Sequence, residues 1–136
     1  MRAVGQGRAV LACVLTLPLA ACGTSDRERD SAAVAHRFHA ALESRDGRAA
    51  CGELSEDTVS KLELQEQKPC SAAILRLQLP KGGTVAVRRV EMRSALAGLA
   101  GGSANFLNEG PDGWKVSGAG CRPTAPDQPY ECELGG

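Results

Sequence analysis

The sequence predicts a single α+β domain in which N-terminal helices cover one face of an antiparallel sheet. Between residues 31 and 77 the apolar residues recur with helical spacing, whereas after the pair Gly82-Gly83 they lie in short, β-branched and partly alternating runs. Helices first and strands afterwards are typical of α+β domains. A chain of 136 residues has room for one such domain, and a core of this size is only marginally stable without a covalent brace.

The first predicted helix spans residues 31–44. Val34, Phe38 and Leu42 are spaced to form one buried stripe along it, and Gly47 can adopt the left-handed conformation that ends a helix. The other predicted helical segments are residues 48–54, 55–66 and 70–77. Pro80 closes the last of them, so the helical half of the domain ends before residue 82.

Four strands are predicted, and together they form an antiparallel meander. They span residues 84–92, 94–100, 103–109 and 114–117. Gly101-Gly102 and Pro111-Asp112-Gly113 lie where tight connections are needed. Arg88 and Arg89 face opposite sides of an alternating strand, and we interpret them as edge charges that discourage aggregation rather than as a basic binding strip.

The N-terminal residues 1–21 have the pattern of a signal peptide. Two arginines and no acid precede residues 9–21, in which only Thr16 is polar, and this stretch is shorter than the roughly 20 residues that span a bilayer. The sequence Leu19-Ala20-Ala21-Cys22 resembles the lipobox of bacterial lipoproteins at all four positions. The alternative is an ordinary small-residue cleavage site that happens to precede a cysteine.

The lipobox resemblance implies that Cys22 becomes the first residue and carries a thioether-linked diacylglycerol. Two acyl chains hold a protein stably on a membrane where one does not. Residues 22–30 contain no apolar side chain beyond Cys22, so we expect a flexible spacer there and a folded domain over residues 31–136. We therefore expect the protein to be exported and anchored by its lipid to the outer face of the cytoplasmic membrane.

The folded part of the chain is similar to the nuclear-transport-factor-2-like superfamily, and more closely to small exported lipoproteins of actinobacteria. The residues that carry this resemblance are Phe38, Ala41-Leu42, Cys51, Cys70, Gly113-Trp114-Lys115-Val116, Gly120-Cys121-Arg122-Pro123 and Pro129-Tyr130-Glu131-Cys132. It covers roughly residues 31–134. The resemblance implies a cone-like domain, in which helices pack on a strongly curved sheet and leave a pocket.

Four cysteines remain once Cys13 is removed with the leader and Cys22 is lipidated. An even number in an exported domain indicates disulfides, and four cysteines allow three pairings. We favour Cys51–Cys70 and Cys121–Cys132, because each closes a local loop on one side of the change from helices to strands. A structural zinc site is the alternative, but the chain has no C-x-x-C pair.

His36, His39 and Glu43 form the one cluster that suggests a metal or acid–base site. At about 100° per residue, His39 lies at about 300° and Glu43 at about 340° from His36, away from the predicted stripe. We therefore interpret the three as a solvated face and expect no metal ligand among them. Tyr130 and Trp114 are interpreted as packing residues.

The resemblance also implies an enzymatic alternative, because the superfamily includes isomerases and dehydratases with carboxylates, tyrosine or histidine inside the cone. The six aspartates all fall in predicted spacer, cap or turn positions: Asp26, Asp30, Asp46, Asp57, Asp112 and Asp127. Glu91 and Glu109 lie on predicted strands without an evident base beside them. We therefore expect no catalytic residue.

Composition argues against several other classes of function. The formal net charge is zero and aromatic residues make up only 3% of the chain, so neither charge nor stacking favours a nucleic-acid partner. The chain has no G-x-S-x-G motif, P-loop or dinucleotide fingerprint, and we expect no cofactor. The resemblance implies a pocket, so the prediction is a non-catalytic binding or accessory module for a small apolar ligand or a membrane-protein neighbour. A pocket isomerase or hydro-lyase and an assembly partner of an integral membrane protein are the alternatives.

Overall fold

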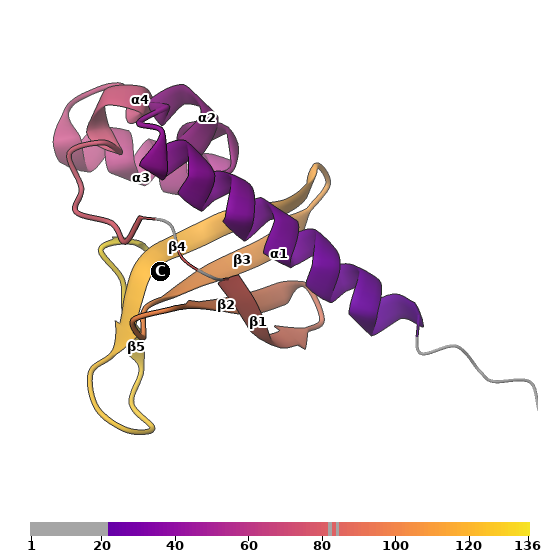
Figure 1. Ribbon diagram of the computed structural model, residues 1–136. Helices are drawn as coiled ribbons and strands as arrows, with labels where there is room; N and C mark the ends of the chain where they lie inside the picture. The colour runs from indigo at the N-terminus through magenta and orange to yellow at the C-terminus, as the bar shows by residue number, and fades with distance from the viewer. Residues whose placement is uncertain (1–21, 82, 84) are drawn as a thin grey trace, which may run out of the picture.

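The computed structural model describes residues 22–81, 83 and 85–136, which form an α+β domain (Figure 1). Its elements are α1 (Cys22–Glu43), α2 (Gly47–Gly52), α3 (Glu56–Glu66), α4 (Cys70–Ala73), β1 (Val85–Glu91), β2 (Ser94–Leu99), β3 (Ala104–Gly110), β4 (Gly113–Pro123), β5 (Tyr130–Glu131) and β6 (Leu134–Gly135). The predicted order of helices and strands is confirmed. The predicted signal peptide, residues 1–21, lies outside the described residues.

Helix α1 lies across the sheet and is longer than expected (Figure 1). Val34, Phe38 and Leu42 are buried, as their spacing predicts. The helix begins at Cys22, however, so the structure has a helix over residues 22–30 where a flexible spacer was expected. A tertiary contact explains the difference, because Arg27 in this segment bonds to Glu109 on β3 and holds the first turns against the sheet.

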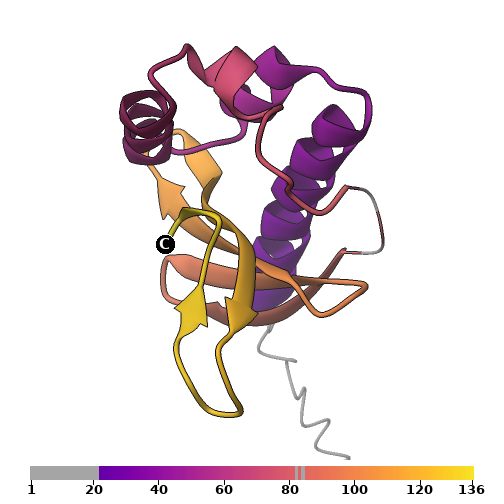
Figure 2. The ribbon, with the colours of Figure 1, turned by 90° about the vertical axis from the view of Figure 1, so that its left-hand side faces the viewer.

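The helices α2, α3 and α4 form a cap at one end of the sheet (Figure 2). Asp46 accepts a hydrogen bond from the Ala49 amide at the start of α2, and Ser55 accepts one from the Thr58 amide at the start of α3. Gly47 does not end α1 in a left-handed conformation as predicted, because Arg45 takes that conformation and Gly47 opens α2.

Helix α4 is shorter than the predicted segment 70–77. It ends at Ala73, and the chain then crosses toward α1 with Ile74 and Leu79 buried. A continued helix would not carry both side chains into the core and bring Pro80 to the middle of α1, where the Pro80 carbonyl accepts a bond from His39. Tertiary burial therefore overrides the helical spacing here.

Strands β1 to β4 form the predicted antiparallel meander, in the order β1-β2-β3-β4. The short strands β5 and β6 also pair with β4, so the sheet has six strands rather than the predicted four. Register shifts interrupt the β1–β2 pair at Val87/Arg89 and the β3–β4 pair beside Phe106. Such bulges bend a strand, and β4 bends along its length (Figure 1).

One hydrophobic core lies between α1, the cap and the sheet. Its largest fully buried apolar side chains are Phe38, Leu62, Ile74, Leu107 and Val116. Among the described helices, none combines the length and the hydropathy that crossing a membrane requires.

Candidate functional site

Cys22, the predicted lipidation residue, is the first residue of α1. This end of the helix lies on the opposite side of the molecule from the α2–α4 cap (Figure 1). The residues that complete the predicted lipobox, Leu19 to Ala21, lie outside the described residues. Any group on Cys22 therefore joins the domain directly at the end of a helix.

Arg27 fixes this end of α1 to two parts of the sheet. Its Nη2 donates to Glu109 Oε2 at 2.5 Å and also to the Met92 carbonyl in the turn between β1 and β2. Its guanidinium carbon lies 5.8 Å from the centroid of the Trp114 ring, a cation–π contact. The Arg27 and Glu109 side chains are 36% and 33% exposed, so solvent screens part of the attraction. Sequence reasoning missed this group because its members are far apart in the chain.

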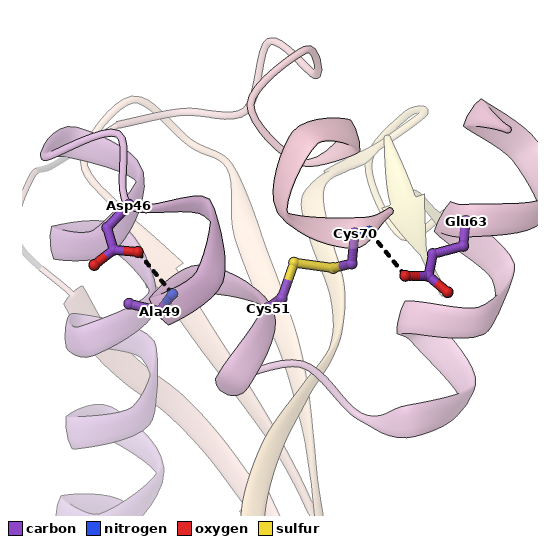
Figure 3. Close-up of a disulfide and its surroundings, with 5 residues drawn as sticks. All are labelled: Asp46, Ala49, Cys51, Glu63 and Cys70. Atoms are coloured by element: carbon purple, nitrogen blue, oxygen red, sulfur yellow. Dashed lines mark hydrogen bonds between the residues drawn. A yellow bond between two sulfur atoms is a disulfide. The ribbon is translucent and has the colours of Figure 1, made fainter. Parts of the chain in front are cut away.

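The Cys51–Cys70 disulfide joins α2 to α4, as predicted (Figure 3). Around it, Glu63 Oε1 on α3 accepts a hydrogen bond from the Cys70 amide at 2.8 Å. The bridge and this carboxylate together connect all three helices of the cap. In an α2–α4 unit of such short helices, covalent closure replaces much of the cohesion that longer helices obtain from packing.

The Cys121–Cys132 disulfide joins the end of β4 to the segment between β5 and β6, again as predicted. It closes the C-terminal hairpin beside β5 and β6, which have only two residues each. All four sulfurs are therefore used in pairs. Within the described residues, no group of three or more histidine, cysteine or acidic side chains is arranged to hold a metal ion.

His39 corrects the prediction of a solvated polar face. Its side chain is 3% exposed and points into the domain, whereas His36 and Glu43 are exposed, so the three do not form a cluster. His39 Nδ1 lies 3.0 Å from the Pro80 carbonyl oxygen, and Nε2 lies 2.6 Å from Asn105 Nδ2 on β3. The buried partner Asn105 gave no sequence signal, because an isolated asparagine in a strand is compatible with many roles.

The hydrogen bonds of His39 define its protonation state. A carbonyl accepts only, so Nδ1–H donates to Pro80, and Nε2 then accepts from the Asn105 amide. Burial lowers the pKa of His39 below its usual 6.5, and the bonds to Pro80 and Asn105 offset part of that effect. The imidazole is therefore neutral at pH 7 and serves as a fixed polar link between α1, the segment that contains Pro80, and the sheet.

The other residues considered for chemistry have structural contacts. Trp114 is buried, and Tyr130 packs edge-to-face on Phe106 with ring centroids 5.4 Å apart. Glu91 is exposed and lies 3.5 Å from Arg89, while Glu109 binds Arg27. Neither carboxylate faces a histidine or another base in the part of the chain that the structure describes.

A cleft of about 870 Å³ lies between the α2–α3 connection and the β3–β4 turn. Leu54, Val59 and Pro111 give it an apolar part, and Glu56 and Asp112 place carboxylates at its lining. The lining residues are Cys51, Gly52, Leu54, Ser55, Glu56, Val59, Ser60, Asn108, Glu109, Gly110, Pro111, Asp112, Gly113 and Lys115. This mixture suits binding of a partly apolar group.

Fold and site together define a small disulfide-braced α+β domain with an open cleft and a helix that begins at a cysteine. Comparison with known protein families, curated proteins and solved structures gives no significant match to this chain. The similarity to the nuclear-transport-factor-2-like superfamily and to exported lipoproteins therefore stays a prediction from the sequence.

Proposed function

We propose that the protein is an extracytoplasmic lipoprotein, attached to the outer face of the cytoplasmic membrane by a diacylglycerol on Cys22, and that it acts as a non-catalytic binding or accessory module. The observation that carries this proposal is the use of the cysteines. Cys51, Cys70, Cys121 and Cys132 pair with one another, so none of them is a partner for Cys22. Disulfides persist in oxidising compartments, which supports export.

The position of Cys22 gives it a role that the other cysteines do not share. It directly follows the lipobox-like residues Leu19 to Ala21, and it is the first residue of α1. A diacylglycerol contributes roughly 0.8 kcal/mol for each buried methylene, which is enough for stable attachment with two chains. The protein surface need not supply further affinity.

The cleft between the α2–α3 connection and the β3–β4 turn supports the binding function. It offers apolar surface from Leu54 and Val59 beside the carboxylates of Glu56 and Asp112. We propose that it receives a small, partly apolar ligand or a segment of a neighbouring membrane protein. The isomerase or hydro-lyase alternative would need titratable side chains that converge on one point. At His39 the neighbouring side chain is the amide of Asn105, which does not transfer protons near neutral pH.

Mass spectrometry of the protein extracted from membranes without reduction tests the proposal. The expected mass is that of residues 22–136 with a diacylglycerol on Cys22 and two disulfides. Cys22→Ala should abolish the lipid and leave the protein uncleaved or unattached, whereas Thr24→Ala, at an exposed position of the same helix, is a control that should behave as wild type. Protein found in the cytosol with residues 1–21 intact would overturn the proposal. Co-purification with one integral membrane protein after mild detergent extraction would favour the accessory role over a soluble-ligand role.

A further inference from the structure

We infer that α1 holds the turn between β1 and β2 against the membrane, so that Met92 enters the headgroup region of the bilayer to which Cys22 is attached. This inference rests on the proposed lipid at Cys22 and adds the orientation of the domain on the membrane. The surface that Met92 contacts is the bilayer that holds the anchor.

The first step is that one continuous helix, α1, connects the attachment point to the domain. Helix α1 runs from Cys22 to Glu43 and carries the core residues Phe38 and Leu42 on its later turns. A helix transmits orientation as well as position, whereas a flexible spacer transmits neither. A lipid on Cys22 therefore constrains the direction in which the whole domain faces.

The second step is the distance from Cys22 to the sheet. Arg27 is five residues further along, which is about 7.5 Å of helix axis at a rise of about 1.5 Å per residue. The Arg27 guanidinium donates to the Met92 carbonyl and to Glu109. The β1–β2 turn is thus bound beside the first two turns of α1, at the end of the molecule away from the α2–α4 cap (Figure 1).

The turn is also held to the neighbouring strand, so it moves with the sheet. Arg93 Nε donates to the Glu109 carbonyl at 2.9 Å, and the Glu109 amide donates to the Arg93 carbonyl at 2.8 Å. Glu109 therefore connects Arg27, the turn and β3 at one point. Reorientation of the turn away from α1 would break these bonds together.

The third step compares the distance from Cys22 to the turn with the thickness of the headgroup layer. The headgroup layer is about 5–7 Å thick on each side of a hydrocarbon core of about 30 Å. An anchor in the acyl region places Cys22 at the inner limit of that layer. The turn is bound to Arg27, whose backbone is about 7.5 Å further along the helix axis, so with α1 near the membrane normal the turn lies close to the outer limit of the headgroup layer. A tilt of α1 toward the side on which the turn lies brings the turn closer to the bilayer.

The residue that the turn presents fits this position. Met92 is 85% exposed and is one of two exposed large apolar side chains in the described part of the chain. It has a φ of 49°, a backbone conformation that glycine or asparagine adopts more readily. The exposed arginines Arg89 and Arg93 flank it, and their guanidinium groups match lipid phosphates. Arg89 Nε also lies 3.5 Å from Glu91 Oε1, so the net positive charge at the turn is small. The contact of the turn with the bilayer therefore depends more on its closeness to the anchor and on the apolar Met92 side chain than on charge.

The second exposed apolar residue, Leu64, provides the matched control. It is 72% exposed and lies on α3 in the cap, at the far end of the molecule from Cys22 (Figure 1). Its exposure is comparable to that of Met92, but the proposed orientation points it into water. The two positions differ mainly in their place relative to the anchor.

Fluorescence quenching by lipids tests the orientation. Full-length Met92→Trp and Leu64→Trp variants are isolated with their lipid and placed in phosphatidylglycerol–phosphatidylethanolamine vesicles that contain lipids brominated near the headgroup. Both variants share the fluorescence of the buried Trp114, which serves as a common background. Above it, we expect the brominated lipids to quench most of the fluorescence of the tryptophan at position 92 and little of that at position 64. Insertion of a Gly/Ser linker between Cys22 and Gly23 should abolish the quenching at position 92 without removing the lipid.

The outcomes separate the orientation from the proposed function. If mass spectrometry shows the diacylglycerol but position 92 is unquenched, or is quenched no more than position 64, the orientation is wrong and the lipoprotein proposal stands. Persistent quenching in the linker variant contradicts the role given to α1. If Cys22 carries no lipid, both the proposed function and the orientation fail.

Discussion

His39 is a neutral imidazole with both nitrogens engaged inside the domain. It donates to the Pro80 carbonyl and accepts from Asn105, and it thereby ties α1 to the connection before β1 and to β3. Protonation would place a second donor opposite the Asn105 amide and a charge in a buried site. The folded state therefore disfavours the imidazolium.

The pH dependence of stability follows from this arrangement. Burial lowers the pKa of His39 in the folded state below 6.5, so under acid conditions the unfolded state binds more protons there. The stabilisation is complete above about pH 6.5 and is lost as the pH falls below that value, by at most about 1.4 kcal/mol for each pH unit. Urea unfolding of wild type between pH 7.5 and 5.5 should show this loss.

Two histidine variants test whether His39 causes this loss of stability at acid pH. His39→Gln should be less stable at pH 7.5, because its amide fits the two bonds poorly, but should lose less stability on acidification than wild type. His36→Gln is the control on the same helix, and its exposed side chain should leave most of the slope in place. An unchanged slope in the His39 variant would show that other groups cause the acid sensitivity.

The sequence alone could not identify the burial of His39. On the helical wheel it lies about 60° from Leu42, at the margin of the predicted stripe. Whether such a marginal position is buried depends on what crosses it, and here the segment that includes Leu79 and Pro80 does so. Pro80 comes 41 residues after His39, so no local pattern shows this contact.

At the scale of elements, local signals predicted the first three strands and the limits of α3 well. Helix α3 and the strands β1 to β3 begin and end within one residue of their predicted limits. The prediction failed where long-range contacts decide. Residues 22–30 lack an apolar stripe, yet Arg27 holds them to β3, and the two-residue strands β5 and β6 are too short to show a period.

Gly47 shows how closely the short helices of the cap approach one another. A Cβ at this position would collide with the backbone carbonyl of Ser71 on α4. Because that obstacle is backbone rather than a movable side chain, Gly47→Ala should destabilise the protein by about 1–3 kcal/mol. Urea denaturation monitored by circular dichroism measures the change.

Gly52 is the matched control within the same helix. A Cβ there meets no heavy atom within 4 Å, so Gly52→Ala should leave stability unchanged or raise it by up to about 1 kcal/mol. Equal destabilisation by both alanine substitutions would indicate a general effect on α2 rather than the contact between Gly47 and Ser71.

At the scale of the whole molecule, the two disulfides brace two parts of the domain that are built from short elements. Cys51–Cys70 holds the cap of short helices, and Cys121–Cys132 holds the C-terminal hairpin. Both pairings were predicted from loop locality, because elements adjacent in sequence are usually adjacent in space. The curvature of the sheet was expected only from a family resemblance, since bulges such as that at Val87/Arg89 have no clear sequence pattern.

Removing each disulfide should therefore destabilise a different region. The bridges span sequence separations of 19 and 11 residues, for which the chain-entropy model gives about 3 kcal/mol each. That is a large fraction of the roughly 5–15 kcal/mol by which small domains are stable. Hydrogen exchange should show lost protection in residues 47–81 of Cys51→Ala/Cys70→Ala, and in residues 118–136 of Cys121→Ala/Cys132→Ala, with β1 to β3 protected in both.

The cap should depend on its disulfide more than the hairpin does. Helices α2 and α4 are too short to be stable alone, so without the bridge their cohesion rests on the bond from Cys70 to Glu63 and on buried Ala50 and Ala73. The hairpin retains pairing with β4 and buries Leu134. Unfolding in urea without reductant should consequently show a larger loss of stability for Cys51→Ala/Cys70→Ala, and the opposite order would mean that the sheet, rather than the bridge, holds the cap in place.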